Sequence, residues 1–168
     1  MDNKKICVIG LGYVGFPLAI EFSKYYNVVG FDINDDRISQ LKKENDVTGE
    51  IDSQTIKDSK LYLTSSKEEI LDSNIYIVTV PTPIDETKNP DLTALKNASK
   101  LVGSVIDKNN LVIFESTVYP GCTREECIPI IEKESGLKLN INFLCGYSPE
   151  RINPGDKVNT LKNITKIV

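Results

Sequence analysis

The stretch that decides the fold is Lys-Ile-Cys-Val-Ile-Gly-Leu-Gly-Tyr-Val-Gly, residues 5–15. It begins as a short apolar run, typical of a buried strand, and continues into a Gly-x-Gly-x-x-Gly turn made by Gly10, Gly12 and Gly15. Apolar residues then recur at helical spacing, at Val14, Leu18, Phe22 and Tyr25. The stretch therefore predicts a strand, a tight glycine turn and a helix.

Strand-like and helix-like segments alternate along the rest of the chain. Further strands are predicted over 27–32, 61–63, 75–80, 111–114 and 142–145, with a seventh over 164–168. Helices are predicted over 33–44, 66–71 and 91–105, with a short helical turn inside the polar segment 45–60. A last helix is predicted after Thr123, because Glu126 stands at the capping-box spacing.

Near-continuous apolar strands separated by helices indicate a parallel sheet that is covered on both faces. We therefore expect an α/β fold, a Rossmann-like doubly wound parallel sheet with helices on both faces. Residues 1–168 are expected to form one domain.

Composition excludes several classes of partner. The 20 Lys and Arg residues stand against 24 Asp and Glu, which gives a formal net charge of -4 and no basic surface for nucleic acid. No stretch approaches the roughly 20 apolar residues of a membrane span, and the N-terminus lacks the apolar stretch of a secretory signal. We expect a cytoplasmic protein that binds small molecules, with neither nucleic acid nor a membrane as partner.

The chain has four cysteines and no histidine. The lack of histidine removes the commonest general base and nearly every zinc-site pattern, so no metal site is expected. Cys7, Cys122, Cys127 and Cys145 form no Cys-x-x-Cys pair, and the cytoplasm would keep them as thiols. We expect structural roles for all four.

The residues around the glycine turn fit a dinucleotide site. Gly10 permits the tight turn, Gly12 lets the backbone approach a pyrophosphate, and Gly15 lets helix and strand pack closely. Asp32 ends the next predicted strand, 22 residues after Gly10, where a carboxylate binds ribose hydroxyls and repels a 2'-phosphate. This favours NAD over NADP, although Arg37 could serve a phosphate. A ligand-free turn, a flavin site and an S-adenosylmethionine site stay open.

Proline, serine, threonine and glutamate follow three later strands. They lie in segments 80–83, 115–121 and 147–151. In an open parallel sheet, ligands bind at the carboxyl ends of the strands, where the strand order reverses. Each segment alone would serve to end a strand, but together with the glycine turn they predict one cleft.

Together these motifs resemble the N-terminal NAD-binding domain of the UDP-glucose/GDP-mannose dehydrogenase family. The residues that carry the resemblance are Gly10 to Gly15, Asp32 with Arg37, Val80 to Pro83, Ser116-Thr117 with Pro120-Gly121, and Ser148-Pro149-Glu150. Segment 148–156 looks like the branch that oxidises UDP-N-acetylhexosamines, with glucosamine, galactosamine or mannosamine as the sugar. The UDP-glucose branch carries a second glutamate where this chain has Pro154.

The resemblance implies a reaction used in polysaccharide biosynthesis. The sugar C6 alcohol is oxidised to a carboxylate in two hydride transfers to two NAD molecules, through a thioester on a cysteine. Glu150 and Thr117 would be catalytic, Thr117 by holding a substrate-linked water and Glu150 by positioning that water or shuttling its proton. Glu150 and Arg151 would bind the substrate, and Glu50 would stand at its entrance. The implied cofactor contacts are Gly10, Gly12, Tyr13, Val14, Gly15, Asp32, Arg37, Pro81, Thr82 and Thr117.

The resemblance also shows what residues 1–168 lack: the family's catalytic cysteine segment, its dimerisation helix and its UDP-binding domain. The chain stops on an apolar stretch instead of a polar tail. We therefore expect the N-terminal part of a longer homodimeric enzyme, inactive by itself. Cys122 is a weak candidate for a substitute nucleophile, because a helix entrance can lower a thiol's pKa. A hydroxyacid-dehydrogenase-type NAD domain and a stand-alone NAD-binding sensor module remain alternatives.

Overall fold

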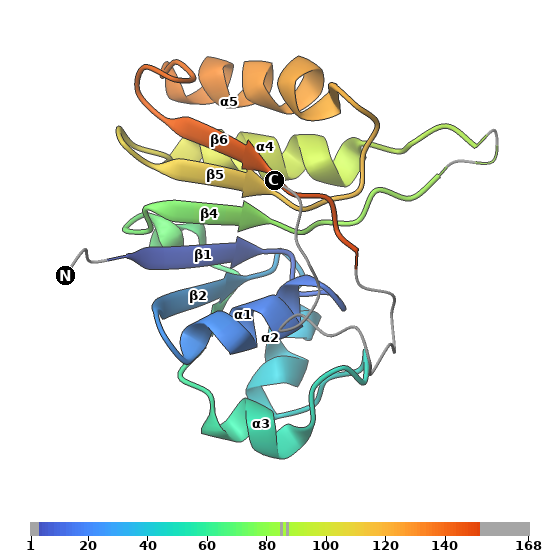
Figure 1. Ribbon diagram of the computed structural model, residues 1–168. Coiled ribbons are helices and arrows are strands. Elements are labelled where there is room, and N and C mark those ends of the chain that lie inside the picture. Colours follow the sequence, from blue (N-terminus) through green and yellow to red (C-terminus); the bar gives the residue numbers. More distant parts are fainter. Residues whose placement is uncertain (1–3, 85, 87, 152–168) are drawn as a thin grey trace.

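A six-stranded sheet forms the centre of the computed structural model, which describes residues 4–84, 86 and 88–151 (Figure 1). The strands are β1 (Lys5–Ile9), β2 (Asn27–Phe31), β3 (Tyr62–Thr64), β4 (Ile75–Val78), β5 (Leu111–Phe114) and β6 (Leu144–Tyr147). They lie in the order β3-β2-β1-β4-β5-β6, and every neighbouring pair is parallel. This confirms the doubly wound fold, and it places the reversal of strand order between β1 and β4.

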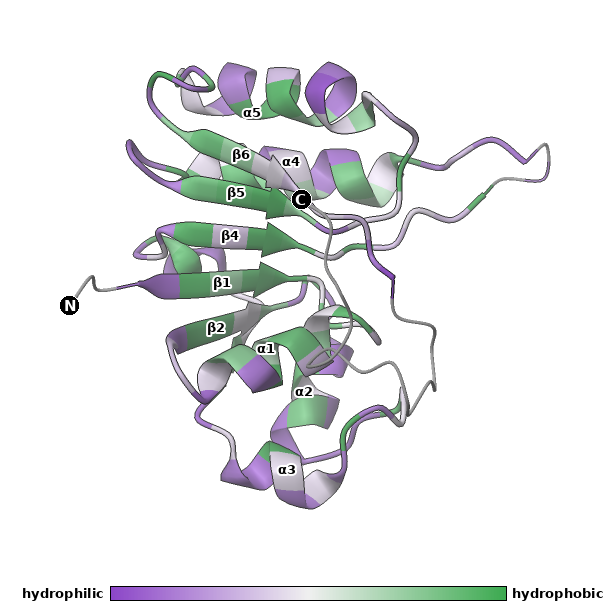
Figure 2. Ribbon diagram, in the orientation of Figure 1, coloured by the Kyte–Doolittle hydropathy of each residue, from purple (hydrophilic) through white to green (hydrophobic). Residues whose placement is uncertain are grey.

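Helices cover both faces of the sheet. They are α1 (Gly15–Ser23), α2 (Asp35–Lys42), α3 (Ser53–Asp58), the 3-10 helix η1 (Lys67–Ile70), α4 (Thr93–Val105), the π turn η2 (Thr123–Cys127) and α5 (Ile128–Ser135). Successive strand residues face opposite layers, so Ile6 and Val8 pack with α1, α2 and α3, whereas Cys7 and Ile9 pack with α4 and α5. Figure 2 shows strands that are mostly hydrophobic and helices of mixed colour, as this layering requires.

The cap of α2 fixes the chain directly after β2. The Asn34 side chain accepts hydrogen bonds from the amides of Asp36, at 3.0 Å, and Arg37, at 3.2 Å. Asp35 and Asp36 occupy the first turn, where the helix dipole favours negative charge. The cap therefore holds Asp32 and Arg37 close to one end of the sheet.

Four predicted elements have boundaries that differ from the structure by about two residues. Helix α2, predicted over 33–44, runs from Asp35 to Lys42. Strand β4 ends at Val78 instead of residue 80, since Pro81 has no N–H to donate to the next hydrogen bond of the ladder. Helix α4 begins at Thr93, whose amide donates to Asp91 Oδ1 at 2.9 Å, so Asp91 precedes the helix. Strand β6 runs from 144 to 147, because the sheet pairs Tyr147 with Phe114 and extends the strand beyond its apolar run. The predicted strand 164–168 lies outside the described residues.

The capping box predicted at Thr123 was wrong. Thr123 makes no capping hydrogen bond and belongs to the π turn that precedes α5. Pro129 near the start of α5 has no N–H to donate to the carbonyl of residue 125, so the chain takes a wider turn there. Glu126 instead pairs with Lys96 of α4 at 2.7 Å.

Candidate functional site

A cavity of about 680 Å³ opens at the carboxyl ends of the strands, where the strand order reverses. All but one of the predicted cofactor residues line it; the exception is Gly15, which packs against Gly10 and Thr79. Of the predicted substrate residues, Glu150 lines the cavity, whereas Arg151 and Glu50 do not. The lining residues are Gly10, Leu11, Gly12, Tyr13, Val14, Asp32, Asn34, Arg37, Val47, Thr48, Thr79, Val80, Pro81, Thr82, Pro83, Glu115, Ser116, Thr117 and Glu150.

The glycine turn packs against the end of β4 so closely that side chains are excluded. Gly10 has a φ of +93°, and a Cβ on it would lie 3.1 Å from Val80 Cγ1. A Cβ on Gly15 would lie 1.9 Å from the Gly10 carbonyl oxygen and 2.2 Å from Thr79 Oγ1. The Thr79 hydroxyl donates to that same Gly10 oxygen at 2.7 Å. Thr79 thus joins the turn to β4, a role that sequence reasoning missed because Thr79 sits inside an apolar run.

The entrance to α1 offers backbone donors to the cavity. Phe16 N donates to Gly12 O at 3.0 Å, so the amides of the preceding residues lie before the helical hydrogen-bond ladder begins. A Cβ on Gly12 would meet nothing within 4 Å, which means that the backbone faces open space there. A helix N-terminus with such an approach suits a phosphate group.

The Asp32 carboxylate binds the glycine turn and also lines the cavity. Its Oδ2 accepts a hydrogen bond from Leu11 N at 2.8 Å, and its Oδ1 accepts one from Asn34 N at 2.9 Å. Each carboxylate oxygen can accept a further hydrogen bond. Asp32 lines the cavity, so it can present acceptors to ribose hydroxyls while it holds the turn.

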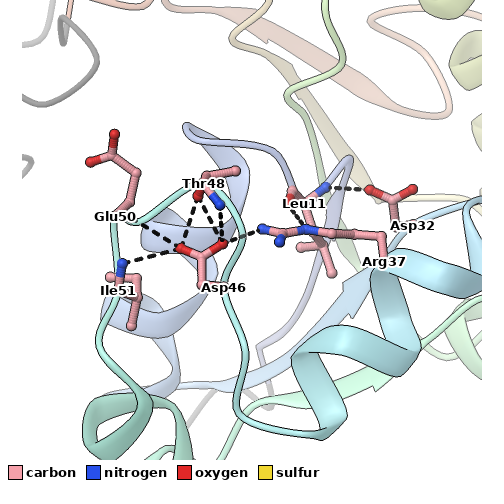
Figure 3. A network of polar contacts seen from close by, with 7 residues as sticks. All are labelled: Leu11, Asp32, Arg37, Asp46, Thr48, Glu50 and Ile51. Carbon is pink, nitrogen blue, oxygen red and sulfur yellow. Dashed lines mark hydrogen bonds and ion pairs between the residues drawn. The ribbon is translucent and has the colours of Figure 1, made fainter.

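Arg37 and Asp46 form an ion pair beside Asp32 (Figure 3). Arg37 is 8% exposed; its Nε donates to Leu11 O at 2.8 Å and its Nη2 to Asp46 Oδ1 at 2.8 Å. Its guanidinium also lies over the Phe16 ring, 5.4 Å from the ring centre. Burial raises the pKa of Asp46, but hydrogen bonds from Arg37 and Thr48 outweigh it and hold this pKa below its ordinary value.

Asp46 was not among the site residues predicted from the sequence. The available signal was local, because an Asp two residues before a Thr in a polar loop is typical of an Asx turn. The sequence gives no sign of the distant partner, since Arg37 lies on a helix nine residues earlier.

Neutral hydroxyl groups join the loops that follow β4 and β5. Thr82 Oγ1 donates to the Thr117 carbonyl, and Ser116 Oγ donates to the Val80 carbonyl at 2.6 Å. Thr82 and Thr117, predicted as neighbours in one cleft, are therefore in direct contact. Glu150 follows β6 and lines the same cavity, and its Oε1 accepts a hydrogen bond from Arg151 N at 2.6 Å.

The four cysteines are free thiols that burial keeps protonated. Burial raises the pKa of Cys127 to about 11 and that of Cys145 to about 12, and it raises the pKa of Cys7 still further. Cys122 is fully buried, lies outside the cavity, and also has a raised pKa because of burial. The idea that a helix entrance lowers its pKa was therefore wrong, since desolvation dominates.

The described residues contain neither a metal-binding cluster nor a membrane-spanning helix. Within 4–84, 86 and 88–151, no group of three or more His, Cys, Asp or Glu side chains is placed to hold a metal ion. In the same residues, no helix combines the length and apolar character needed to cross a bilayer.

The chain is similar in sequence and in fold to nucleotide-sugar dehydrogenases. The model of the UDP-glucose/GDP-mannose dehydrogenase family, NAD binding domain, matches residues 4–168. A UDP-N-acetyl-D-glucosamine 6-dehydrogenase of Pseudomonas aeruginosa is 53% identical, and one of Salmonella typhi is 54% identical; each match covers 99% of this chain and 40% of the relative. The solved UDP-D-ManNAc dehydrogenase of Pyrococcus horikoshii is 36% identical with a TM-score of 0.81, covering 90% of this chain and 37% of that one. The chain thus spans about two-fifths of the relatives' length.

Proposed function

The chain belongs to the UDP-glucose/GDP-mannose dehydrogenase family as its NAD-binding domain, and on that premise we propose the reaction that it serves. It is the cofactor-binding part of an enzyme that oxidises the C6 alcohol of a UDP-N-acetylhexosamine to the uronic acid with two NAD. The family match sets aside the hydroxyacid-dehydrogenase alternative. One observation carries the proposal: the glycine turn, Asp32, Thr117 and Glu150 line a single cavity at the reversal of strand order.

The cavity residues suit a dinucleotide bound in one orientation, with its adenosine at the Asp32 end. The open backbone at Gly12 suits the pyrophosphate, and Asp32 suits the adenosine ribose. The Asp32 charge disfavours a 2'-phosphate. Two nitrogens of Arg37 are already bound to Leu11 O and Asp46, which supports NAD over NADP. Bound NAD supplies the hydride acceptor.

The opposite end of the cavity suits the sugar. Thr117 and Glu150 lie there on loops after β5 and β6. A hydroxyl both donates and accepts, so Thr117 holds a substrate-linked water, and the Glu150 carboxylate orients that water or takes its proton. Arg151 adjoins Glu150 but does not line the cavity, and we propose it as a second substrate contact beside Glu150.

We propose that the other groups needed for the reaction belong to the rest of the enzyme. We assign residues 1–168 to the N-terminal NAD-binding domain, with the nucleophilic cysteine, the dimerisation helix and the UDP-binding domain elsewhere in a homodimer. The isolated chain then binds NAD without turning over a UDP-sugar. Four free thiols suit a reducing compartment, which supports a cytoplasmic location.

Calorimetric titration of residues 1–168 with NAD and NADP tests the cofactor assignment. We expect NAD to bind at least about tenfold more tightly, and Asp32→Ala to weaken it because the ribose acceptors and the Leu11 anchor are lost. Asp36→Ala is the matched control, since Asp36 is an exposed acid of α2 outside the cavity. Equal affinity for the two cofactors would contradict the assignment.

The substrate class is tested in the full-length enzyme by following NADH formation. We expect turnover with UDP-N-acetylglucosamine, UDP-N-acetylgalactosamine or UDP-N-acetylmannosamine. Replacing Glu150 by Gln should lower kcat by roughly a hundredfold or more, because general acid and base groups contribute that much. Turnover of UDP-glucose alone would refute the proposed branch.

A further inference from the structure

We propose that Asp46 is a positioning residue for the cofactor. Its buried carboxylate binds the backbone of the loop 46–51, and through Arg37 it also holds the glycine turn. The loop and the turn together form the wall of the cavity beside Asp32. The proposal rests on the proposed function, in which the adenosine of NAD lies at Asp32. It adds a residue that no motif of the sequence includes.

The groups that contact the Asp46 carboxylate are hydrogen-bond donors. Besides Arg37, Oδ1 accepts from Thr48 N at 3.2 Å and Thr48 Oγ1 at 2.8 Å, and Oδ2 accepts from Glu50 N at 3.2 Å and Ile51 N at 3.1 Å. The Asp46 side chain has 0% exposure. Only an ionised carboxylate accepts at both oxygens without donating, so the loop is folded around its own anion.

The same carboxylate is linked to Asp32 through a continuous series of contacts (Figure 3). Asp46 holds Nη2 of Arg37, and Nε of Arg37 donates to the carbonyl of Leu11. The amide of Leu11 in turn donates to Asp32 at 2.8 Å. Both backbone polar groups of Leu11, in the centre of the glycine turn, are therefore bound by side chains of this series.

The fastened loop forms part of the cavity. Val47 and Thr48, which follow Asp46 directly, both line it. Val47 is 63% exposed, which leaves an apolar surface for a ligand to cover. In Figure 3 the Glu50 side chain points away from Asp46, so its backbone amide provides the contact. Without Asp46, the loop and Arg37 lose their common anchor, while Thr117 and Glu150 keep theirs.

This arrangement predicts a selective kinetic effect. In the full-length enzyme, Asp46→Asn should raise the KM for NAD by about tenfold and leave kcat within about twofold, because the wall is remote from the reacting atoms. The KM for the UDP-sugar should stay unchanged. In residues 1–168, the Kd for NAD should rise by the same factor, since an amide places a donor against donors.

Asp52→Asn is the matched control. Asp52 caps α3 with similar local contacts, accepting from Thr55 N at 2.9 Å and Thr55 Oγ1 at 2.7 Å, but it lies outside the cavity. A merely structural role predicts lower melting temperatures for both variants and an unchanged Kd for NAD. The positioning role predicts that only Asp46→Asn weakens NAD binding.

Two further measurements keep the proposal testable if Asp46→Asn folds poorly. Thr48→Val removes one donor and should raise the Kd for NAD about threefold. In Asp46→Ala, added formate should refill the anion site and recover NAD affinity, whereas chloride at the same concentration should not. Unchanged NAD affinity in Asp46→Asn and Thr48→Val, or equal recovery with chloride, overturns the proposal. Failure of the wild-type chain to bind NAD would instead overturn the proposed function.

Discussion

The two walls of the cavity are held together by different chemistry. On the β1–β2 side, the charged side chains of Asp32, Arg37 and Asp46 bind backbone groups of the glycine turn and of the loop 46–51. On the β4–β5 side, the hydroxyls of Thr82 and Ser116 bind backbone carbonyls. Hydrogen bonds to charged groups are roughly twice as strong as neutral ones. The first wall should therefore be the more rigid and the more sensitive to changes of charge.

The largest effect is expected at Gly15, which packs against both Gly10 of the glycine turn and Thr79 at the end of β4. The Cβ of Gly15→Ala would overlap the Gly10 carbonyl and the Thr79 hydroxyl, so we expect a loss of about 3 kcal/mol in the free energy of unfolding, at the upper end of overpacking costs. NAD binding should be lost as well, because the turn must move. Urea denaturation and calorimetry measure the two effects.

Gly12→Ala is the contrasting variant. Its Cβ would meet no protein atom within 4 Å and would point into the space offered to the pyrophosphate. Stability should stay close to that of the wild type while NAD affinity falls. Equal losses of stability for the two variants would contradict the close packing described for Gly15.

A smaller effect is expected on the neutral wall. Ser116→Ala removes the hydrogen bond to the Val80 carbonyl and should cost about 1 kcal/mol, with roughly a fivefold weaker affinity for NAD. Calorimetry of Ser116→Ala beside Asp46→Asn compares the two walls directly. A larger loss for Ser116→Ala would reverse the ranking of charged above neutral contacts.

The sequence was most informative where a local pattern has one structural solution. The alternation of apolar strands with helices, and the glycine turn followed by Asp32, led to the correct fold, and the residues after three strands do line one cavity. The predicted boundaries of helices and strands were less accurate. The bounds of β6, for example, depend on its pairing with β5, which the sequence does not show. The cofactor and substrate contacts themselves stay predictions.

Side-chain contacts between residues distant in the chain could not be predicted from the sequence. Nothing in a polar loop shows that Asp46 is buried against Arg37, and nothing in an apolar strand shows that Thr79 turns back to Gly10. The prediction of a lowered pKa for Cys122 was wrong for the same reason. A helix entrance is visible in sequence, but full burial depends on the packing of distant elements.

The smallest and most selective effect is expected from pH. Because the pKa of Asp46 in the folded chain lies below its ordinary value of 3.8, the charged form stabilises the fold fully above that value, and this contribution is lost as the pH falls through the folded pKa. The difference in unfolding free energy between wild type and Asp46→Asn should stay constant between roughly pH 8 and 5 and shrink below about 4. The difference for Ser116→Ala should stay flat throughout, because a hydroxyl does not titrate there. Urea denaturation across this range measures both, and parallel curves would show that charge does not distinguish the two walls.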